Sequence, residues 1–175
     1  MNVKNIKSWQ IGVVALAASA IAGLSSRRNK QSERKQYNTE LKQAPWAPPA
    51  WVFAPAWTVN SFFVLSALRR LLTCKDISER KTLLVLQAAI WTIFFSFGYI
   101  YFYKKSPVLA AVWTVSDALL TLKSVQLLIK RDPQIAKKYL PSLLWTGYAS
   151  TLAIYQAAKN KDPLVDKLVR NWKKS

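Results

Sequence analysis

The sequence predicts an all-α membrane protein, a bundle of five transmembrane helices. The 175 residues are 51% apolar and 13% aromatic, with a formal charge of +18, which is too hydrophobic for a disordered basic chain. The apolar residues gather in runs of 19 to 22 residues, and a helix needs roughly 20 to cross a bilayer. The runs show no strand-like alternation. They cover residues 6–24, 51–72, 83–102, 108–129 and 139–158.

The first run fits either a retained helix or a secretory signal peptide. Lys4 and Lys7 give it a basic start, and residues 18–20 resemble a small-residue cleavage site. We expect a retained helix. The connection that follows, residues 25–50, is long and carries six basic residues, and it shows no periodicity before Tyr37.

A stretch rich in Trp and Pro precedes and opens the second run. Pro48 and Pro49 suit the first turn of a helix, where no backbone donor is needed. Trp46 and Trp51 flank that start, and indoles prefer the membrane interface. An aromatic belt would explain an isolated Trp and Pro pair, but four Pro and three Trp in residues 45–58 indicate more.

A single acid lies near the middle of the fourth run. A carboxylate at that depth costs roughly 2.5–3.5 kcal/mol on insertion scales, so Asp117 should face the bundle interior. It would serve there either as a polar contact in a cavity or in a hydrogen bond between helices. Lys123 lies near the end of the run, where its side chain can reach the interface.

Helical spacing places aromatic and polar residues on one face of each later run. Such faces suit a flat hydrophobic ligand held by a few hydrogen bonds, although inward faces also gather small and polar residues simply to pack helices. The candidate contacts on these faces are Trp57, Trp113, Asp117, Trp145, Ala149 and Leu152.

Composition excludes most catalytic and metal chemistry. The chain has no His and a single Cys, which removes imidazole catalysis and clustered thiolate metal sites. We therefore expect no catalytic residue, no metal and no required cofactor. Loop Lys and Arg number 11 on one membrane side and 14 on the other, which slightly favours a cytosolic C-terminus. Basic residues spread over both sides argue against nucleic-acid binding.

The spacing of residues 46–57, Trp-x-Pro-Pro-x-Trp-Val-Phe-x-Pro-x-Trp, resembles the signature of the TspO/MBR family, the tryptophan-rich sensory proteins or translocator proteins. A second, weaker match follows Pro141 and extends to Asn160. The chain departs from the family pattern at Ser142, which replaces a Tyr, and at Ala153, which replaces an Asn. The third run is also poorly matched.

This resemblance implies five membrane helices, a homodimer and a ligand cavity. Trp57 and Trp145 match tryptophans that line that cavity, and Ala149 matches a pocket alanine. Four residues match the motif at its rim, namely Trp46, Pro48, Pro49 and Trp51.

The function expected from the resemblance is binding of tetrapyrroles, such as porphyrin or haem, or of similar flat hydrophobic or sterol-like ligands. The protein would act in the lipid bilayer as a sensor, scavenger or transporter, with the loop before Trp46 as a lid. The basic residues Arg34, Lys35 and Lys42 of that loop could attract porphyrin carboxylates. The alternatives are a light- and oxygen-dependent porphyrin-degrading enzyme and an anchoring protein without a small ligand.

Overall fold

The computed structural model describes residues 5–26, 29–74 and 79–173. Five of the basic residues counted above lie outside the described residues: Lys4, Arg27, Arg28, Lys75 and Lys174. The described part of the chain consists of helices and loops, without strands. The long helices are α1 (Ser8–Leu24), α3 (Phe53–Thr73), α4 (Arg80–Gly98), α5 (Pro107–Leu128) and α6 (Pro133–Lys159). The shorter ones are α2 (Lys30–Lys35), η2 (Gln36–Glu40), η3 (Ala50–Val52), η4 (Tyr99–Tyr103) and α7 (Pro163–Trp172).

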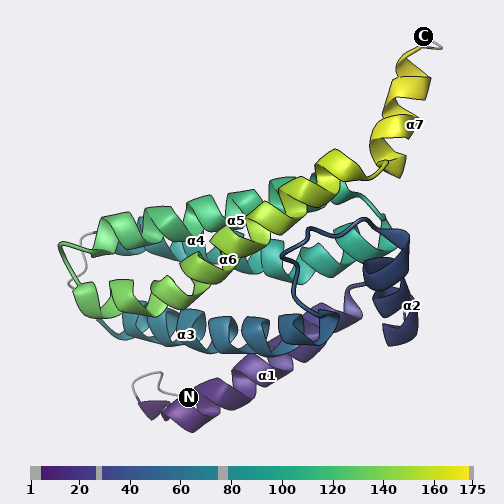
Figure 1. Cartoon of the computed structure of the whole chain (residues 1–175). Coiled ribbons are helices and arrows are strands. Elements are labelled where there is room, and N and C mark those ends of the chain that lie inside the picture. The colour runs from purple at the N-terminus through teal and green to yellow at the C-terminus, as the bar shows by residue number, and fades with distance from the viewer. Residues whose placement is uncertain (1–4, 27–28, 75–78, 174–175) are drawn as a thin grey trace.

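The five long helices pack into one bundle (Figure 1), and their contacts follow a closed ring. Around the ring, α1 contacts α3, α3 contacts α6, α6 contacts α5, α5 contacts α4, and α4 returns to α1. Contacts between α3 and α4 cross the middle of this ring. The segment that contains α2 and η2 covers one end of the bundle, and α7 projects from the same end (Figure 1).

Three of the helices begin in the same way. Ser106, Asp132 and Asp162 each precede a proline, and each side chain accepts a hydrogen bond from a backbone N–H of the first turn that follows. Proline suits this position because its missing N–H would have no partner within the helix. The Asp132 cap starts α6 at Pro133, earlier than the apolar run that began at residue 139.

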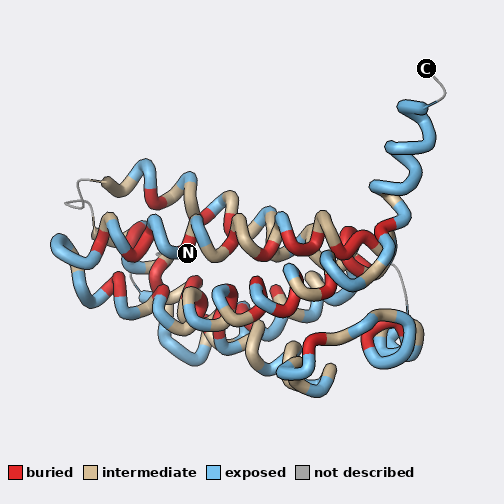
Figure 2. Tube along the Cα trace, turned by 45° about the horizontal axis from the view of Figure 1, so that its top comes forward, coloured by how far each residue is buried: buried red, intermediate tan, exposed pale blue. Residues whose placement is uncertain are grey.

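The hydrophobic core fills the half of the bundle far from α2. It is built from the end of α3, the start of α4, the end of α5 and the start of α6, with Leu71, Leu83, Leu128, Ile135 and Tyr139 fully buried. Many large apolar side chains face outward instead; Leu144 is 75% exposed and Val85 is 69% exposed. Exposed residues lie on the outside of the bundle and buried ones on its inside (Figure 2). Exposed apolar side chains on so many helices are typical of a surface that faces lipid.

Three of the described helical segments are long and apolar enough to cross a membrane: Ala50–Thr73, Arg80–Tyr103 and Pro107–Leu128. Helix α1 is apolar but has only 17 residues. Helix α6 has 27 residues but a more polar composition. Five helices therefore form the bundle, while membrane crossing by α1 and α6 stays a prediction.

Candidate functional site

A cavity of about 400 Å³ occupies the half of the bundle opposite the core. Every helix of the ring contributes to its wall: the end of α1, the start of α3, the end of α4, the first half of α5 and the last half of α6. The wall is mainly aromatic and aliphatic. Its aromatic rings include those of Trp51, Phe53, Trp57, Phe94, Phe97 and Tyr101.

The roof of the cavity comes from the segment between α1 and α3. Lys30, Glu33, Arg34 and Tyr37 line the cavity from α2 and η2. The Tyr37 hydroxyl donates a hydrogen bond to the carbonyl of Pro48 at 2.8 Å. Burial, with a smaller contribution from nearby Tyr148, raises the pKa of Tyr37 to about 12. The Tyr37 side chain therefore remains a neutral donor at physiological pH.

A chain of amide hydrogen bonds ties this roof to the bundle. Gln36 Nε2 donates to the carbonyl of Tyr101 at 2.7 Å. Gln156 on α6 accepts from the Tyr101 hydroxyl at 2.9 Å and donates to Gln43 Oε1 at 2.6 Å. Gln43 in turn donates to the carbonyl of Tyr37 at 2.6 Å. The side chains of Gln36, Tyr101 and Gln156 are buried, so the roof is held by bonds that water does not easily replace.

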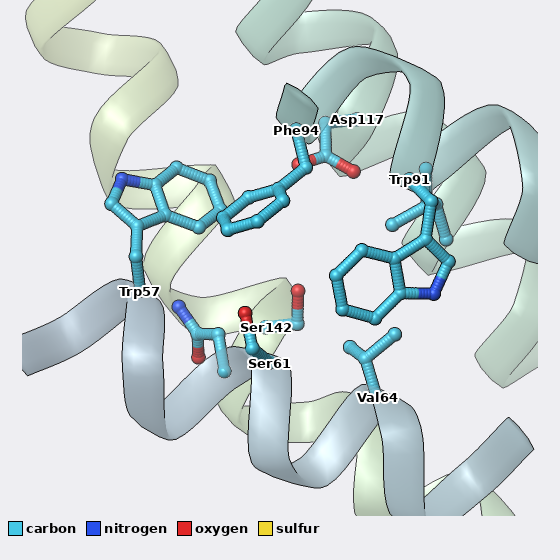
Figure 3. Close-up of a pocket in the computed structure, with 9 residues that line it drawn as sticks. Trp57, Ser61, Val64, Trp91, Phe94, Asp117 and Ser142 are labelled. Atoms are coloured by element: carbon cyan, nitrogen blue, oxygen red, sulfur yellow. The ribbon is translucent and has the colours of Figure 1, made fainter. Parts of the chain in front are cut away.

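A second, much smaller cavity of about 20 Å³ lies toward the core (Figure 3). Trp57, Phe94 and Asp117 line both cavities and so form the partition between them. Ser61 and Ser142 face the small cavity from α3 and α6 (Figure 3). A space of roughly 10–15 Å³ holds one water molecule, so this polar pocket has room for a single one.

Several buried polar atoms beside the cavities have no hydrogen-bond partner within the described part of the chain. Asp117 is only 2% exposed, and its Oδ1 is one of these atoms. Others are Asn60 Nδ2 at the small cavity and Ser19 Oγ at the large one. A buried polar group without a partner is costly. These atoms are therefore available to a bound molecule that can satisfy them.

The model of the TspO/MBR family matches residues 11–158. That match covers most of the chain and includes the whole cavity wall. The chain belongs to the TspO/MBR family. Together with its long apolar helices, this membership makes it an all-α membrane protein. No curated protein matches the chain.

Half of the residues that the sequence singled out line the large cavity of this TspO/MBR protein. They are Trp51, Trp57, Asp117, Ala149 and Leu152. Trp145 lies directly behind Trp57, with its ring centroid 6.5 Å from that of Trp57 and 5.6 Å from that of Phe53. Its buried Nε1 has no partner among the described residues.

The rim residue Trp46 lies against the outer side of α6. Its Nε1 donates to Thr151 Oγ1 at 3.2 Å, its carbonyl accepts from the Tyr148 hydroxyl at 2.7 Å, and its ring meets Tyr155 edge-on. Pro48 contributes its carbonyl to Tyr37, and the exposed Pro49 precedes η3. These residues therefore fix the entry to α3 without lining the cavity.

Trp113 also lies away from the cavity, at the contact between α5 and α4. Its Nε1 donates to Ser96 Oγ at 2.9 Å. The cavity-facing side of α5 runs through Ala110, Thr114 and Asp117 instead. A shift of one residue turns a helix by about 100°, which is enough to move Trp113 from the cavity to the neighbouring helix.

Sequence reasoning did not single out Tyr37 or the contribution of α1. Ser19, Ala22 and Gly23 line the cavity from α1, and their spacing of three and four residues is the available signal, since small residues at that spacing let helices approach. Of the three basic loop residues proposed above, Arg34 lines the cavity; Lys35 and Lys42 do not. Among the described residues, no cluster of His, Cys, Asp or Glu could hold a metal ion.

Proposed function

We propose that this protein binds tetrapyrroles, or similar flat hydrophobic ligands, in the large cavity and acts in the membrane as a sensor, scavenger or transporter. The observation that carries the proposal is the cavity itself, about 400 Å³ with an aromatic wall. Small-molecule sites typically measure about 300–1,000 Å³ and combine apolar walls with a few orienting polar groups. Family membership supports the same assignment.

The polar groups are arranged to orient such a ligand. Lys30 and Arg34 lie at the roof, where they can meet carboxylates on the rim of a porphyrin. Asp117 lies at the floor, and its unpartnered Oδ1 can accept from a pyrrole N–H. Trp57 lines both cavities, as Asp117 does, and offers a broad apolar surface between the roof and the floor. The ligand would therefore bind with its charged edge toward the roof.

Quenching of tryptophan fluorescence by protoporphyrin, haem and a sterol tests the proposal, because Trp51 and Trp57 line the cavity. We expect saturable quenching by at least one of the three. Ala149→Phe fills the cavity and should weaken binding by tenfold or more, whereas Ala158→Phe, exposed on the same helix, should leave it unchanged. Absence of saturable quenching for all three ligands, or equal affinity in both variants, would contradict the proposal.

Charge reversal tests the proposed orientation of the ligand in the cavity. Arg34→Glu and Lys30→Glu should weaken protoporphyrin binding and reduce its dependence on salt. The matched reversals Lys35→Glu and Lys42→Glu change exposed side chains that do not line the cavity, so binding should be nearly unaffected. Equal effects in the two pairs would mean that only the general charge of the loop matters.

The contact between Trp57 and Trp145 favours one second candidate, light- and oxygen-dependent breakdown of porphyrin. The two rings meet edge-on, with Trp57 on the cavity wall and Trp145 behind it. Such a pair can pass an electron between the ligand and the protein interior without any acid–base residue. Illumination of the purified protein with protoporphyrin in air would yield a new absorbing product, lost in Trp145→Phe. If no product forms, the protein binds its ligand without degrading it.

A further inference from the structure

Helix α7 lies wholly beyond residues 11–158, the part of the chain that the family model matches. It projects from the bundle, and nearly its whole length is exposed (Figures 1 and 2). A ten-residue helix in water gains little from its own hydrogen bonds. We therefore expect α7 to be stabilised by contact with another surface.

The residues of α7 separate into two faces. At 100° per residue, all of its large apolar side chains fall within one sector, and all of its charged side chains fall in the opposite one. Leu168 and Trp172, one turn apart on the apolar face, are 68% and 83% exposed. The apolar face consists of Leu164, Val165, Leu168, Val169 and Trp172. The polar face consists of Asp166, Lys167, Arg170 and Asn171.

The buried carboxylate of Asp162 fixes the start of α7 next to the start of α5. Asp162 Oδ2 accepts from Ser106 Oγ at 2.6 Å and from the backbone N–H of Val108 at 2.9 Å, both at the start of α5. Asp162 Oδ1 accepts from the backbone N–H groups of Leu164 and Val165 at 2.9 and 3.1 Å. One side chain thus ties the first turn of α7 to the first turn of a candidate membrane span.

The direction of α7 is also consistent with a place at the membrane surface. In both views, α7 rises steeply across the long axis of the bundle (Figures 1 and 2). Because the spanning helices run along that axis, a helix that starts at their end and runs across it follows the membrane surface. Trp172 then lies at the depth where indoles concentrate.

The charge of this region points to the partner. Lys161 and Lys173 flank the helix, and Lys167 and Arg170 lie on its polar face, all of them exposed. Asp166 is the one exposed acid on α7. A short helix with an apolar face and a basic edge binds anionic lipid surfaces through both features.

We propose that α7 is an interfacial helix that lies on the bilayer, with its apolar face among the acyl chains and its basic residues on anionic phospholipid headgroups. The apolar sector is wide enough to bury five side chains. The hydrogen bonds of Asp162 to the first turns of α5 and α7, here called the Asp162 clamp, hold α7 at the membrane boundary. The lipid surface is therefore the partner closest to its apolar face. This inference rests on the membrane character of the protein and is independent of the cavity ligand.

Spin-label accessibility in the full-length protein tests the proposal. In a Cys74→Ser background, a nitroxide is attached at Leu168→Cys on the apolar face or at Asn171→Cys on the polar face. The proteins are placed in nanodiscs of phosphatidylcholine, with or without phosphatidylglycerol. In the anionic discs, we expect the label at 168 to be more accessible to oxygen and the label at 171 to a water-soluble nickel chelate. Both positions are exposed, so neither label should disturb folding.

The charge contribution is tested by Lys167→Glu combined with Arg170→Glu, which should raise nickel accessibility at position 168 in anionic discs. The control pair Lys130→Glu with Lys137→Glu is exposed at the opposite end of the bundle and should have no effect. Equal nickel accessibility at 168 and 171 in anionic discs would overturn the proposal. Equal protection of position 168 with and without phosphatidylglycerol would overturn its anionic component.

Discussion

At the scale of single residues, Asp117 is the most informative side chain. It is buried, it borders both cavities, and its Oδ1 has no partner among the described residues. A buried polar group without a partner costs free energy. The proposed ligand would offset this cost by donating a hydrogen bond to Asp117.

We predict that Asp117→Leu weakens protoporphyrin binding by about tenfold, since one lost hydrogen bond to a polar group is worth about 1–3 kcal/mol. The same substitution should raise the thermal unfolding temperature in detergent, because it removes an unpaired buried group. Asp117→Asn keeps an acceptor oxygen and should retain most of the affinity. An unchanged dissociation constant in a folded Asp117→Leu protein would place this residue outside the binding site.

Helical spacing in the sequence placed several residues on the face that borders the cavity, while their contact with a ligand stays a prediction. Trp57, Asp117, Ala149 and Leu152 were singled out by their spacing or their position in an apolar run, and all four border the large cavity. Helical spacing did not show that Thr114, rather than Trp113, faces the cavity. Which face of α5 meets the cavity depends on where α4 packs against it. Tyr37 lies in a segment without periodicity, so only the folded roof reveals its role.

At the scale of elements, the contact between α4 and α1 depends on Gly98. A Cβ at this position would lie 2.5 Å from Ser25 Oγ, 3.1 Å from the backbone N of Ser26 and 3.3 Å from the carbonyl of Ala22. The Ser25 side chain can move, but the two backbone atoms move only with the end of α1. That end forms part of the cavity wall.

We predict that Gly98→Ala lowers the unfolding temperature and weakens ligand binding, because it displaces the end of α1. Gly147→Ala is the matched control, since nothing lies within 4 Å of its added Cβ. Alanine is favoured over glycine in a helix by about 1 kcal/mol, so this variant should be at least as stable as the wild type. Equal stability of Gly98→Ala and Gly147→Ala in thermal unfolding would contradict the close packing of α1.

The roof depends on Gln156, which joins Tyr101 to Gln43. We predict that Gln156→Leu accelerates ligand dissociation in stopped-flow fluorescence, because the roof loses its tie to α6. The buried groups left unpaired should also lower stability by about 1–3 kcal/mol. Gln87→Leu is the control: it removes an equally buried amide that bonds Val64, Tyr139 and Trp91 in the core half. It should lower stability but leave dissociation unchanged; similar rates in both variants would refute the role of the roof.

The Asp162 clamp between α5 and α7 predicts that the stability of the fold depends on pH in the acid range. Burial alone raises the pKa of Asp162, but hydrogen bonds from the Ser106 hydroxyl and from the N–H groups of Val108, Val165 and Leu164 outweigh it, so the pKa is lowered. A lowered pKa stabilises the fold at neutral pH, and this contribution is lost as pH falls below 3.8, the ordinary value. Asp162→Asn should therefore unfold at a lower temperature than the wild type at neutral pH, with a difference that shrinks in acid. Asp166→Asn, exposed on α7, should show no such convergence.

At the scale of the whole molecule, α6 shows why mean hydropathy can miss a helix that packs within the bundle. Its mean hydropathy falls short of that of a candidate span, although it packs in the ring between α3 and α5. The polar residues responsible, including Ser142, Thr146, Ser150 and Gln156, are buried, so they face the bundle rather than lipid. The apolar runs therefore located this helix, whereas only the packing explains its polar content.

Orientation follows from the same arrangement. The sequence assigns 14 basic residues to the side that includes the roof, the connection before α5 and the C-terminal tail, against 11 to the other side. Basic residues favour the cytosolic side. We predict that α7 is cytosolic and that Cys74, after the end of α3, lies on the opposite side.

Labelling with an impermeant maleimide tests this arrangement, because α4, α5 and α6 separate Cys74 from α7. Cys74 should react in vesicles of one orientation. Asn171→Cys, in a Cys74→Ser background, should react only in vesicles that expose the cytosolic face. If both positions react from the same side, α6 does not cross the membrane and the five-helix arrangement is wrong. If they react from opposite sides but with α7 outside, the helices cross as predicted, and the small excess of basic residues does not set the orientation.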